Sequence, residues 1–189
     1  MKRNILACLA VAVLVGVAVI SQRGLGQTAT AQAMQAPLFQ VEPGFFKIPN
    51  NWVTGQGSAV SVDKHDNVWI IHRPRYVPAE KRPMVAPPVM EFDSAGKFIQ
   101  GWGGFADGYD WPDQEHSVYV DPSDNVWISG SARPALAGPG DRVLRSDNML
   151  LKFTTNGKFL MQIGKRDTST GDDDTKNVYS ATDLQLFPK

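Results

Sequence analysis

Two segments of this chain occur twice, and that repetition limits the fold more than any single motif does. Residues 61–70 (SVDKHDNVWI) return 58 positions later as residues 119–128 (YVDPSDNVWI). Residues 91–98 (EFDSAGKF) return 61 positions later as residues 152–159 (KFTTNGKF). In a repeat protein, each copy of the structural unit buries a face against its neighbour. The sequence therefore predicts a chain built from successive copies of one such unit.

Each copy has the pattern of two β-hairpins. Apolar residues alternate with polar ones at 60–62, a polar tip follows at 63–67, and an apolar strand returns after it. The second hairpin turns at 94–96 in the first copy and at Asn156-Gly157 in the second. An Asn-Gly pair between alternating apolar runs is a strong hairpin signal. No stretch after residue 34 has the three-and-four spacing of apolar residues that a helix needs.

These hairpins predict an all-β fold, a β-propeller of four-stranded antiparallel blades. The units span about 53–104 and 105–164, and a third begins at about 177. A propeller closes with ~4–8 blades. About two blades and the start of a third do not close a ring, so we expect a fragment of a protein about twice as long. Assembly of several copies into a ring is the alternative, and the sequence does not fix the oligomeric state.

The amino-terminal residues have the pattern of an export signal. Lys2 and Arg3 precede sixteen uncharged residues at 5–20, and small residues suited to signal cleavage follow. We predict a signal peptide at 1–33, an extension at 34–52 and the partial propeller at 53–189, with an uncleaved anchor as the alternative. The only cysteine, Cys8, lies inside the signal, which leaves the mature chain without disulfides. A periplasmic or extracellular protein of a bacterium is expected.

The charge balance argues against whole classes of partner. Nineteen basic and nineteen acidic residues give a formal net charge of zero, whereas a nucleic-acid-binding domain needs a basic face. No membrane contact is expected after signal cleavage. The acidic run at 172–174 lacks calcium-loop spacing and is predicted to be a solvated loop. A peptide or small-molecule ligand remains possible.

Long connections separate the predicted strands at 72–88, 129–148 and 165–176. Five prolines in the first connection exclude a central strand or a helix there. Such long loops on a rigid scaffold usually carry function. Tyr109 and Trp111 have no counterpart in the other copy and precede His116, so they are the predicted substrate-binding residues.

Three stretches resemble the NHL-repeat propellers. They are VSVD followed by NVWIIHR at 60–63 and 67–73, HSVYVD followed by NVW at 116–121 and 125–127, and ATDL at 181–184. The resemblance covers roughly 53–189. It implies NHL-type blades and a six-bladed ring in the full-length protein. Among functional members, the chain is similar to the peptidyl-α-hydroxyglycine α-amidating lyases.

The lyase resemblance implies a metal site. His116 matches the histidine that opens a strand and binds zinc, and Arg73 matches a catalytic arginine. The backbone carbonyls of Val60 and Val118 match positions that hold a structural calcium. The activity implied is zinc-dependent cleavage of a carbon–nitrogen bond, which gives a peptide amide and glyoxylate. The chain departs from the family pattern where Pro74 follows Arg73 and where Glu115 replaces a proline.

Other readings of these residues stay open. His116 is also explained as a hydrogen-bonded structural histidine, since the remaining histidines, His65 and His72, are no convincing second ligands. Two alternative functions are a non-catalytic propeller that binds a peptide, protein or glycan on its rim, and a calcium-dependent lactonase-type hydrolase. The hydrolase needs a cluster of carboxylates and asparagines that these blades do not show. The 189-residue product alone is expected to be inactive.

Overall fold

The computed structural model describes residues 38–134, 145–171 and 173–186. The predicted signal peptide (1–33) lies outside the described residues, as does Asp172 of the acidic run. The chain divides into two units, 1–41 and 42–189. In the first unit, residues 38–41 form neither helix nor strand.

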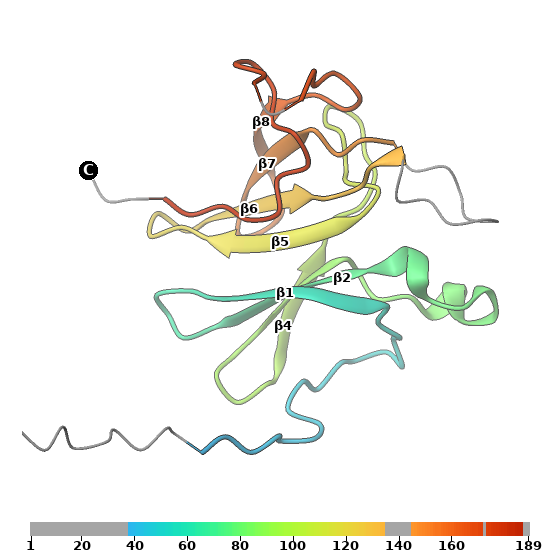
Figure 1. Ribbon diagram of the computed structural model, residues 1–189. Helices are drawn as coiled ribbons and strands as arrows, with labels where there is room; N and C mark the ends of the chain where they lie inside the picture. The colour runs from blue at the N-terminus through green and yellow to red at the C-terminus, as the bar shows by residue number, and fades with distance from the viewer. Residues whose placement is uncertain (1–37, 135–144, 172, 187–189) are drawn as a thin grey trace, which may run out of the picture. The chain divides into compact units, whose positions relative to one another are not determined.

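Eight strands form two four-stranded antiparallel sheets in simple sequence order (Figure 1). The first sheet contains β1 (Gln56–Val62), β2 (Val68–Arg73), β3 (Val89–Phe92) and β4 (Phe98–Trp102). The second sheet contains β5 (Glu115–Val120), β6 (Asn125–Gly130), β7 (Met149–Thr154) and β8 (Phe159–Gly164). The predicted all-β class and the division of each unit into two hairpins are confirmed.

The turn after β1 shows why the repeated tip sequence folds back on itself. A carboxylate oxygen of Asp63 accepts the backbone N–H groups of His65 (2.8 Å) and Asn67 (3.0 Å), while Asp66 takes a positive φ of 63°. Aspartate suits this turn because its short side chain bonds to backbone two residues on. The turn after β5 repeats the arrangement around Asp121, with Asp124 at φ 59°.

The same aspartates hold the repeated tryptophans. The indole N–H of Trp69 donates to Asp63 Oδ2 (3.0 Å), and that of Trp127 donates to Asp121 Oδ2 (2.9 Å). Burial by itself raises the pKa of each carboxyl. The hydrogen bonds from tryptophan and backbone outweigh it, and the pKa of both Asp63 and Asp121 is lowered. In both copies the tryptophan follows the aspartate by six residues, and the hydrogen bond between them joins the turn to the strand after it.

The two sheets pack face to face around a single apolar core. In Figure 1, β1 and β5 run beside each other where the sheets meet, and the N–H of Val120 donates to Ser61 Oγ (3.1 Å). Trp102 of β4 reaches the second sheet, where its ring lies 5.1 Å from that of Phe153 and its N–H donates to Thr155 O (2.9 Å). The core also contains the fully buried residues Trp69, Ile71, Val89, Trp111, Val126, Ile128, Met149 and Leu151.

The predicted extension is part of the folded unit from residue 42 onward. Ile48 and Trp52 pack against a second buried cluster that contains Met90 and Phe92 of the first sheet. The backbone N–H of Lys47 donates to Gly96 O (2.8 Å). Residues 42–53 thus run along the side of the first sheet that faces away from the second sheet (Figure 1).

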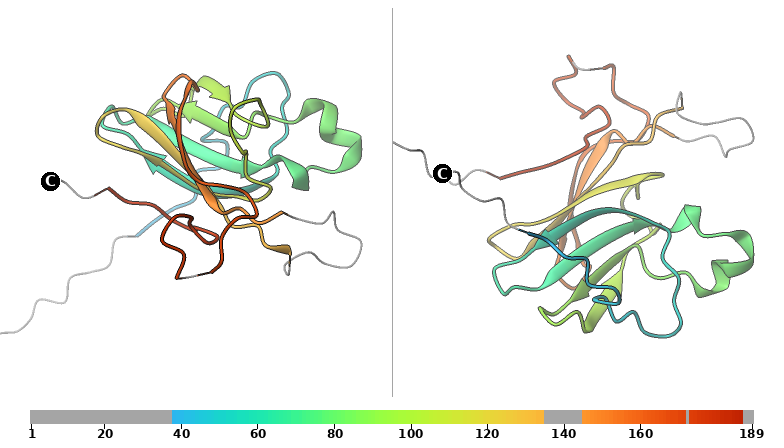
Figure 2. Two further views of the ribbon diagram at one scale, coloured as in Figure 1. Left: turned by 90° about the horizontal axis from the view of Figure 1, so that it is seen from above. Right: turned by 60° about the horizontal axis from the view of Figure 1, so that its bottom comes forward.

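The proline-rich connection (residues 74–88) contains short helical turns, which the sequence analysis excluded. Two 3₁₀ helices, η1 (Pro74–Tyr76) and η2 (Ala79–Met84), follow β2 directly (Figure 2). The expectation was wrong because proline is tolerated in the first turn of a helix, where its missing N–H would have no partner, and because 3₁₀ turns are short; Pro83 lies inside η2. Pro74 opens η1 in this way.

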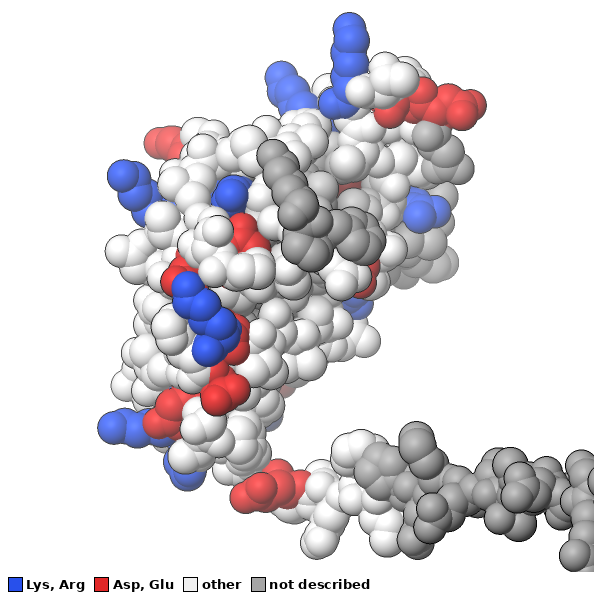
Figure 3. All heavy atoms as spheres, turned by 90° about the vertical axis from the view of Figure 1, so that its left-hand side faces the viewer, with Lys and Arg blue, Asp and Glu red and all other residues white. Residues whose placement is uncertain are grey.

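The third unit predicted from 177 has no strand in the described residues. Residues 181–186 belong to neither sheet, because no described segment pairs with their backbone. The segment still lies against the second sheet, since Thr182 O lies 2.7 Å from Nδ1 of His116 in β5. The face shown in Figure 3 carries Lys and Arg side chains interspersed with Asp and Glu.

Across the described ranges, no helix is both long and apolar enough to cross a bilayer.

Candidate functional site

A large cleft lies between the proline-rich connection and the loop that leads into β5. Its volume is about 990 Å³, which is at the upper end of the range of ligand pockets. We call it the aromatic cleft. It is lined by Trp52, Pro74, Arg75, Tyr76, Arg82, Val85, Ala86, Pro87, Pro88, Trp102, Gly103, Gly104, Phe105, Trp111, Pro112, Asp113 and Glu115.

Its aromatic side chains range from buried to solvent-exposed. Trp111 is 1% exposed and belongs to the core, whereas Tyr76 is 48% exposed and Phe105 is 63% exposed. Gly103 lets the backbone approach Trp111, because a Cβ atom there would lie 2.6 Å from the indole ring. Its φ of +106° also disfavours any other residue. Exposed aromatic faces in a hollow are available for a ligand to stack on.

Glu115, the first residue of β5, places a buried carboxyl group in the cleft. It is 4% exposed, and one of its oxygens accepts the indole N–H of Trp111 (2.9 Å). Burial raises the pKa of Glu115 to about 7, although the hydrogen bond from Trp111 and the charge of Arg73 oppose that rise. At neutral pH this carboxyl group is therefore able either to donate or to accept a proton.

Two arginines of the proline-rich connection flank the cleft. Arg75 donates to the backbone oxygen of Asp113 (3.0 Å), and its guanidinium lies 5.2 Å from the centre of the Tyr76 ring. Arg82 lies in η2 and is exposed. The first contact ties the connection to the loop before β5, so both walls of the cleft are held together.

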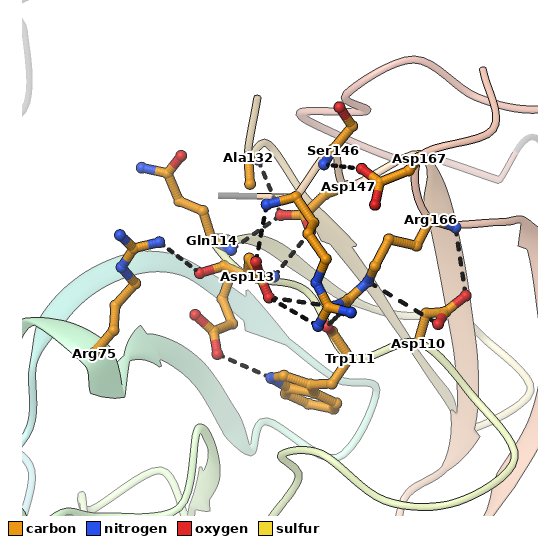
Figure 4. A network of polar contacts seen from close by, with 12 residues as sticks. Arg75, Asp110, Trp111, Asp113, Gln114, Ala132, Ser146, Asp147, Arg166 and Asp167 are labelled. Carbon is orange, nitrogen blue, oxygen red and sulfur yellow. Dashed lines mark hydrogen bonds and ion pairs between the residues drawn. The ribbon is translucent and has the colours of Figure 1, made fainter. Parts of the chain in front are cut away.

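A buried polar network supports this loop from behind (Figure 4). The carboxylate of Asp147 accepts the backbone N–H groups of Asp113 (2.8 Å), Gln114 (2.9 Å) and Ala132 (2.9 Å). Burial raises the pKa of Asp147 to about 6, against the effect of these three donors. Gly130 makes room for this carboxylate, because a Cβ atom there would lie 2.5 Å from Asp147 Oδ2.

Arg166 neutralises the acids of the same loop. It is 7% exposed, and its guanidinium pairs with the carboxylate of Asp113 (3.3 Å) and donates to the backbone oxygen of Trp111. Its backbone N–H points to Asp110 Oδ2 (3.4 Å). The network thereby fixes the segment that carries Trp111 and Glu115, so their orientation toward the cleft is set by rigid surroundings.

Of the residues predicted from sequence, Arg73 and Trp111 both bond to Glu115, and of these two only Trp111 lines the cleft. Arg73 ends β2, and its Nε donates to the backbone oxygen of Glu115 (2.7 Å) while Nη1 donates to Gln56 Oε1 (2.7 Å). Trp111 bonds to the side chain of the same glutamate. A planar guanidinium used in this way braces β2 against β5.

The predicted pair of Tyr109 and Trp111 is divided between two hollows. Tyr109 packs near the rings of Phe153 (5.2 Å) and Phe159 (5.0 Å), and its hydroxyl donates to Gly104 O (3.2 Å). It lines a more open depression of about 430 Å³ on the other side of the loop, together with Gln162. The two aromatic residues therefore do not face one common ligand space.

The predicted metal residues lie on the first strand of each sheet. His116 follows Glu115 in β5, and its Nδ1 lies 2.7 Å from Thr182 O. Val60 and Val118 occupy equivalent positions, opposite Ile70 in one sheet and Ile128 in the other. Val60 is 63% exposed and Val118 is 5% exposed.

The described residues do not make a complete site for either metal. No three histidine, cysteine, aspartate or glutamate side chains converge in the ranges the structure describes. A catalytic zinc needs three protein ligands, of which His116 would be one. Calcium takes 6–8 oxygen ligands, of which the carbonyls of Val60 and Val118 would be two.

Most of the residues that build the aromatic cleft were not predicted from the sequence. Glu115 was noticed only as a departure from a family pattern. A usable signal was present for the connection itself, because five prolines within a long loop indicate a rigid segment. Nothing in the spacing of Asp147 or Arg166 indicates that they reach the loop before β5.

No protein-family model matches the chain, and no curated protein matches it.

Proposed function

We propose that the two sheets are neighbouring blades of an NHL-type β-propeller that a bacterium exports, and that the chain binds a ligand in the aromatic cleft. Three features support the blades: the repeated hairpins, the four-stranded meander of each sheet, and the contact between the first strands β1 and β5. Propellers generally bind ligands on the rim where their long connections gather. The proline-rich connection is such a segment.

One observation carries the binding proposal. A hollow of about 990 Å³ combines exposed aromatic rings with a buried carboxyl group and two arginines on a braced scaffold. Concave, largely apolar sites with a few fixed polar groups are the usual form of a ligand site. The function favoured is therefore non-catalytic recognition of a peptide, protein or glycan.

The test is a screen of peptides and oligosaccharides for ligands that raise the thermal unfolding midpoint of the chain. Tyr76→Ala and Phe105→Ala are expected to abolish the shift, because both side chains are exposed in the cleft. Ile99→Ala is the matched control, since Ile99 is 46% exposed on β4 and does not line the cleft. A hit that survives both cleft substitutions argues against this site.

The lyase-like function is the second candidate, and one contact favours it. A histidine that binds zinc usually gives its other ring nitrogen to a carbonyl or carboxylate, and Nδ1 of His116 has such a partner in Thr182 O. We expect zinc bound by the purified protein to fall in His116→Ala. Equal, substoichiometric zinc in both proteins removes His116 from consideration. Release of glyoxylate from an α-hydroxyglycine peptide tests the activity directly, and none is expected from the 189-residue product alone.

A further inference from the structure

The polar groups available in the aromatic cleft are mainly hydrogen-bond donors. The indole N–H of Trp52 makes no hydrogen bond within the described residues. The hydroxyl of Tyr76 accepts a contact from Gln114 Nε2 (3.4 Å), which leaves its proton to donate. Arg75 uses one guanidinium nitrogen on Asp113 O and keeps further N–H groups, and Arg82 adds others at the edge.

Side-chain acceptors are scarce on the same walls. The side chain of Asp113 is turned into the network behind the loop, where it accepts the backbone N–H of Arg145 (3.0 Å) and pairs with Arg166 (3.3 Å). Glu115 has one oxygen occupied by Trp111. A sugar hydroxyl needs an acceptor for its proton as well as a donor for its oxygen. A buried oligosaccharide would leave several hydroxyl protons unpaired, which is costly.

A proline-rich peptide has the opposite balance and fits these walls. Proline has no backbone N–H but keeps its carbonyl, and its compact apolar ring packs on aromatic faces. In the polyproline II conformation the carbonyls project every ~3.1 Å and the backbone has no internal hydrogen bonds. Tyr76 and Phe105 supply exposed rings, and Trp52 and Tyr76 line the same cleft with side chains that carry a hydrogen-bond donor.

We propose that the aromatic cleft binds a proline-rich peptide segment in the polyproline II conformation, with its carbonyls accepting from Trp52, Tyr76 and the flanking arginines. The proposal rests on the proposed ligand-binding function and adds the class of ligand. Recognition of this kind needs no charge on the peptide. A preformed helix also loses little conformational freedom on binding.

The experiment titrates the 189-residue chain with N-acetyl hexaproline amide, an uncharged probe, and follows binding by calorimetry. A glycine-serine peptide of equal length is the control ligand. The chain is expected to bind hexaproline and not the control. Tyr76→Phe and Trp52→Phe each remove one donor while keeping a ring. Each is expected to weaken binding by about 2- to 12-fold, the value of one net hydrogen bond.

Two further variants keep the result interpretable. Tyr179→Phe removes a hydroxyl from a tyrosine that is 41% exposed outside the cleft, so it is expected to bind like the unmodified chain. Trp52 also packs 5.6 Å from Phe98, and its substitution is therefore judged only if the circular dichroism spectrum is unchanged. Tyr76 is half exposed, and its phenylalanine variant does not depend on that condition.

The possible outcomes separate the two proposals. Binding that weakens in Tyr76→Phe but not in Tyr179→Phe supports the inference. Hexaproline binding that is equal in all variants overturns it, because the peptide then binds elsewhere. A ligand from the screen that depends on Tyr76 and Phe105, with no hexaproline binding, overturns the peptide class and leaves the proposed function standing. Absence of any cleft-dependent ligand overturns both.

Discussion

The two sheets have the same hairpins but bury the same positions to very different extents. Val60 and Val62 of β1 are 63% and 58% exposed, whereas the equivalent Val118 and Val120 of β5 are 5% and 6% exposed. The difference comes from neighbours, since the first sheet covers that face of the second. The repeated sequence therefore determines the geometry of each hairpin, and stacking determines which faces become core.

The two sheets also differ in the side chain that accepts one equivalent backbone N–H group. In the first sheet, the N–H of Gly55 donates to Nδ1 of the buried His72 (3.1 Å). Asp113 occupies the equivalent position in the second sheet, and its N–H donates to Asp147 (2.8 Å). Gly130 replaces the histidine and leaves space for that carboxylate. Only the second solution extends into the network that supports the aromatic cleft.

The largest expected effect breaks the equivalence of the two repeated tryptophans. Trp69 is fully buried between the sheets, while Trp127 is 6% exposed and lies outside that core, with the ammonium of Lys152 4.7 Å from its ring. Trp69→Ala is expected to lower the free energy of unfolding by about 3–5 kcal/mol, as for other large core deletions. Trp127→Ala should cost about 1–2 kcal/mol less, because less of the lost volume becomes an internal cavity.

Urea denaturation of both variants measures this difference. Trp69→Phe and Trp127→Phe are the matched controls, because each removes the indole N–H bond to its aspartate but keeps an aromatic ring. The two phenylalanine variants should be similar to each other. Equal losses in the two alanine variants would mean that packing between the sheets adds nothing to the contribution of Trp69 to the free energy of unfolding.

Features held by residues close together in the sequence could be predicted, and features held by residues far apart could not. The hairpins could be predicted because their turns use contacts within four residues, such as those of Asp63 and Asp121. The aromatic cleft could not, because it depends on pairs such as Arg166 with Asp113 and Asp147 with Gln114, more than thirty residues apart. Such pairs leave no periodic pattern in the sequence. Trp111, predicted from the sequence to bind substrate, lines the cleft but is 1% exposed and packs in the core.

A smaller effect distinguishes the two glycines of the second hairpins. Gly96 and Gly157 have φ values of +75° and +80°, so alanine at either position costs about 1–2 kcal/mol in backbone strain. A Cβ atom at 96 would also lie 1.9 Å from the backbone oxygen of Phe45, whereas one at 157 would meet the side chain of Trp102 at 2.8 Å. We expect Gly96→Ala to be the more destabilising variant.

Limited proteolysis provides a second measurement for this pair. In Gly96→Ala the contact with residues 42–53 must move, so cleavage in that segment should become faster than in the unmodified chain. Gly157→Ala should leave cleavage there unchanged. If both variants leave it unchanged, the segment does not depend on the close approach at Gly96.

His72 and Asp147, which accept the equivalent backbone N–H groups of the two sheets, should give stability opposite dependences on pH. Burial lowers the pKa of His72 below its ordinary value of 6.5, so the folded chain binds this proton less readily than the unfolded chain does. Its contribution to stability is complete above pH 6.5 and falls as the pH drops, by up to about 1.4 kcal/mol per pH unit. Asp147, with its pKa raised to about 6, acts in the opposite direction: its contribution to the stability of the fold falls as the pH rises from 3.8 toward 6.

Comparison of the unmodified chain with His72→Gln isolates the histidine. Unfolding in urea at pH 7.5 and pH 5.5 gives the free energy of unfolding at each pH. The unmodified chain should lose more stability between these values than His72→Gln does, because glutamine does not titrate. An identical loss in both proteins contradicts a buried, neutral His72.

The smallest expected effect concerns the ion pair that joins the tips of the two first hairpins. Lys64 of the first sheet lies 2.8 Å from Asp124 of the second and also donates to Pro122 O (3.2 Å). Both side chains are more than one-third exposed, so water and salt screen the attraction. Lys64→Ala is expected to cost about 0.2–1 kcal/mol at low ionic strength and to approach no effect at ~1 M salt. Lys158→Ala, at an exposed tip of the second sheet, is the control and should show no salt-dependent loss. A large loss in Lys64→Ala that persists at high salt would mean that the tips hold the sheets together, and that the core around Trp69 contributes correspondingly less.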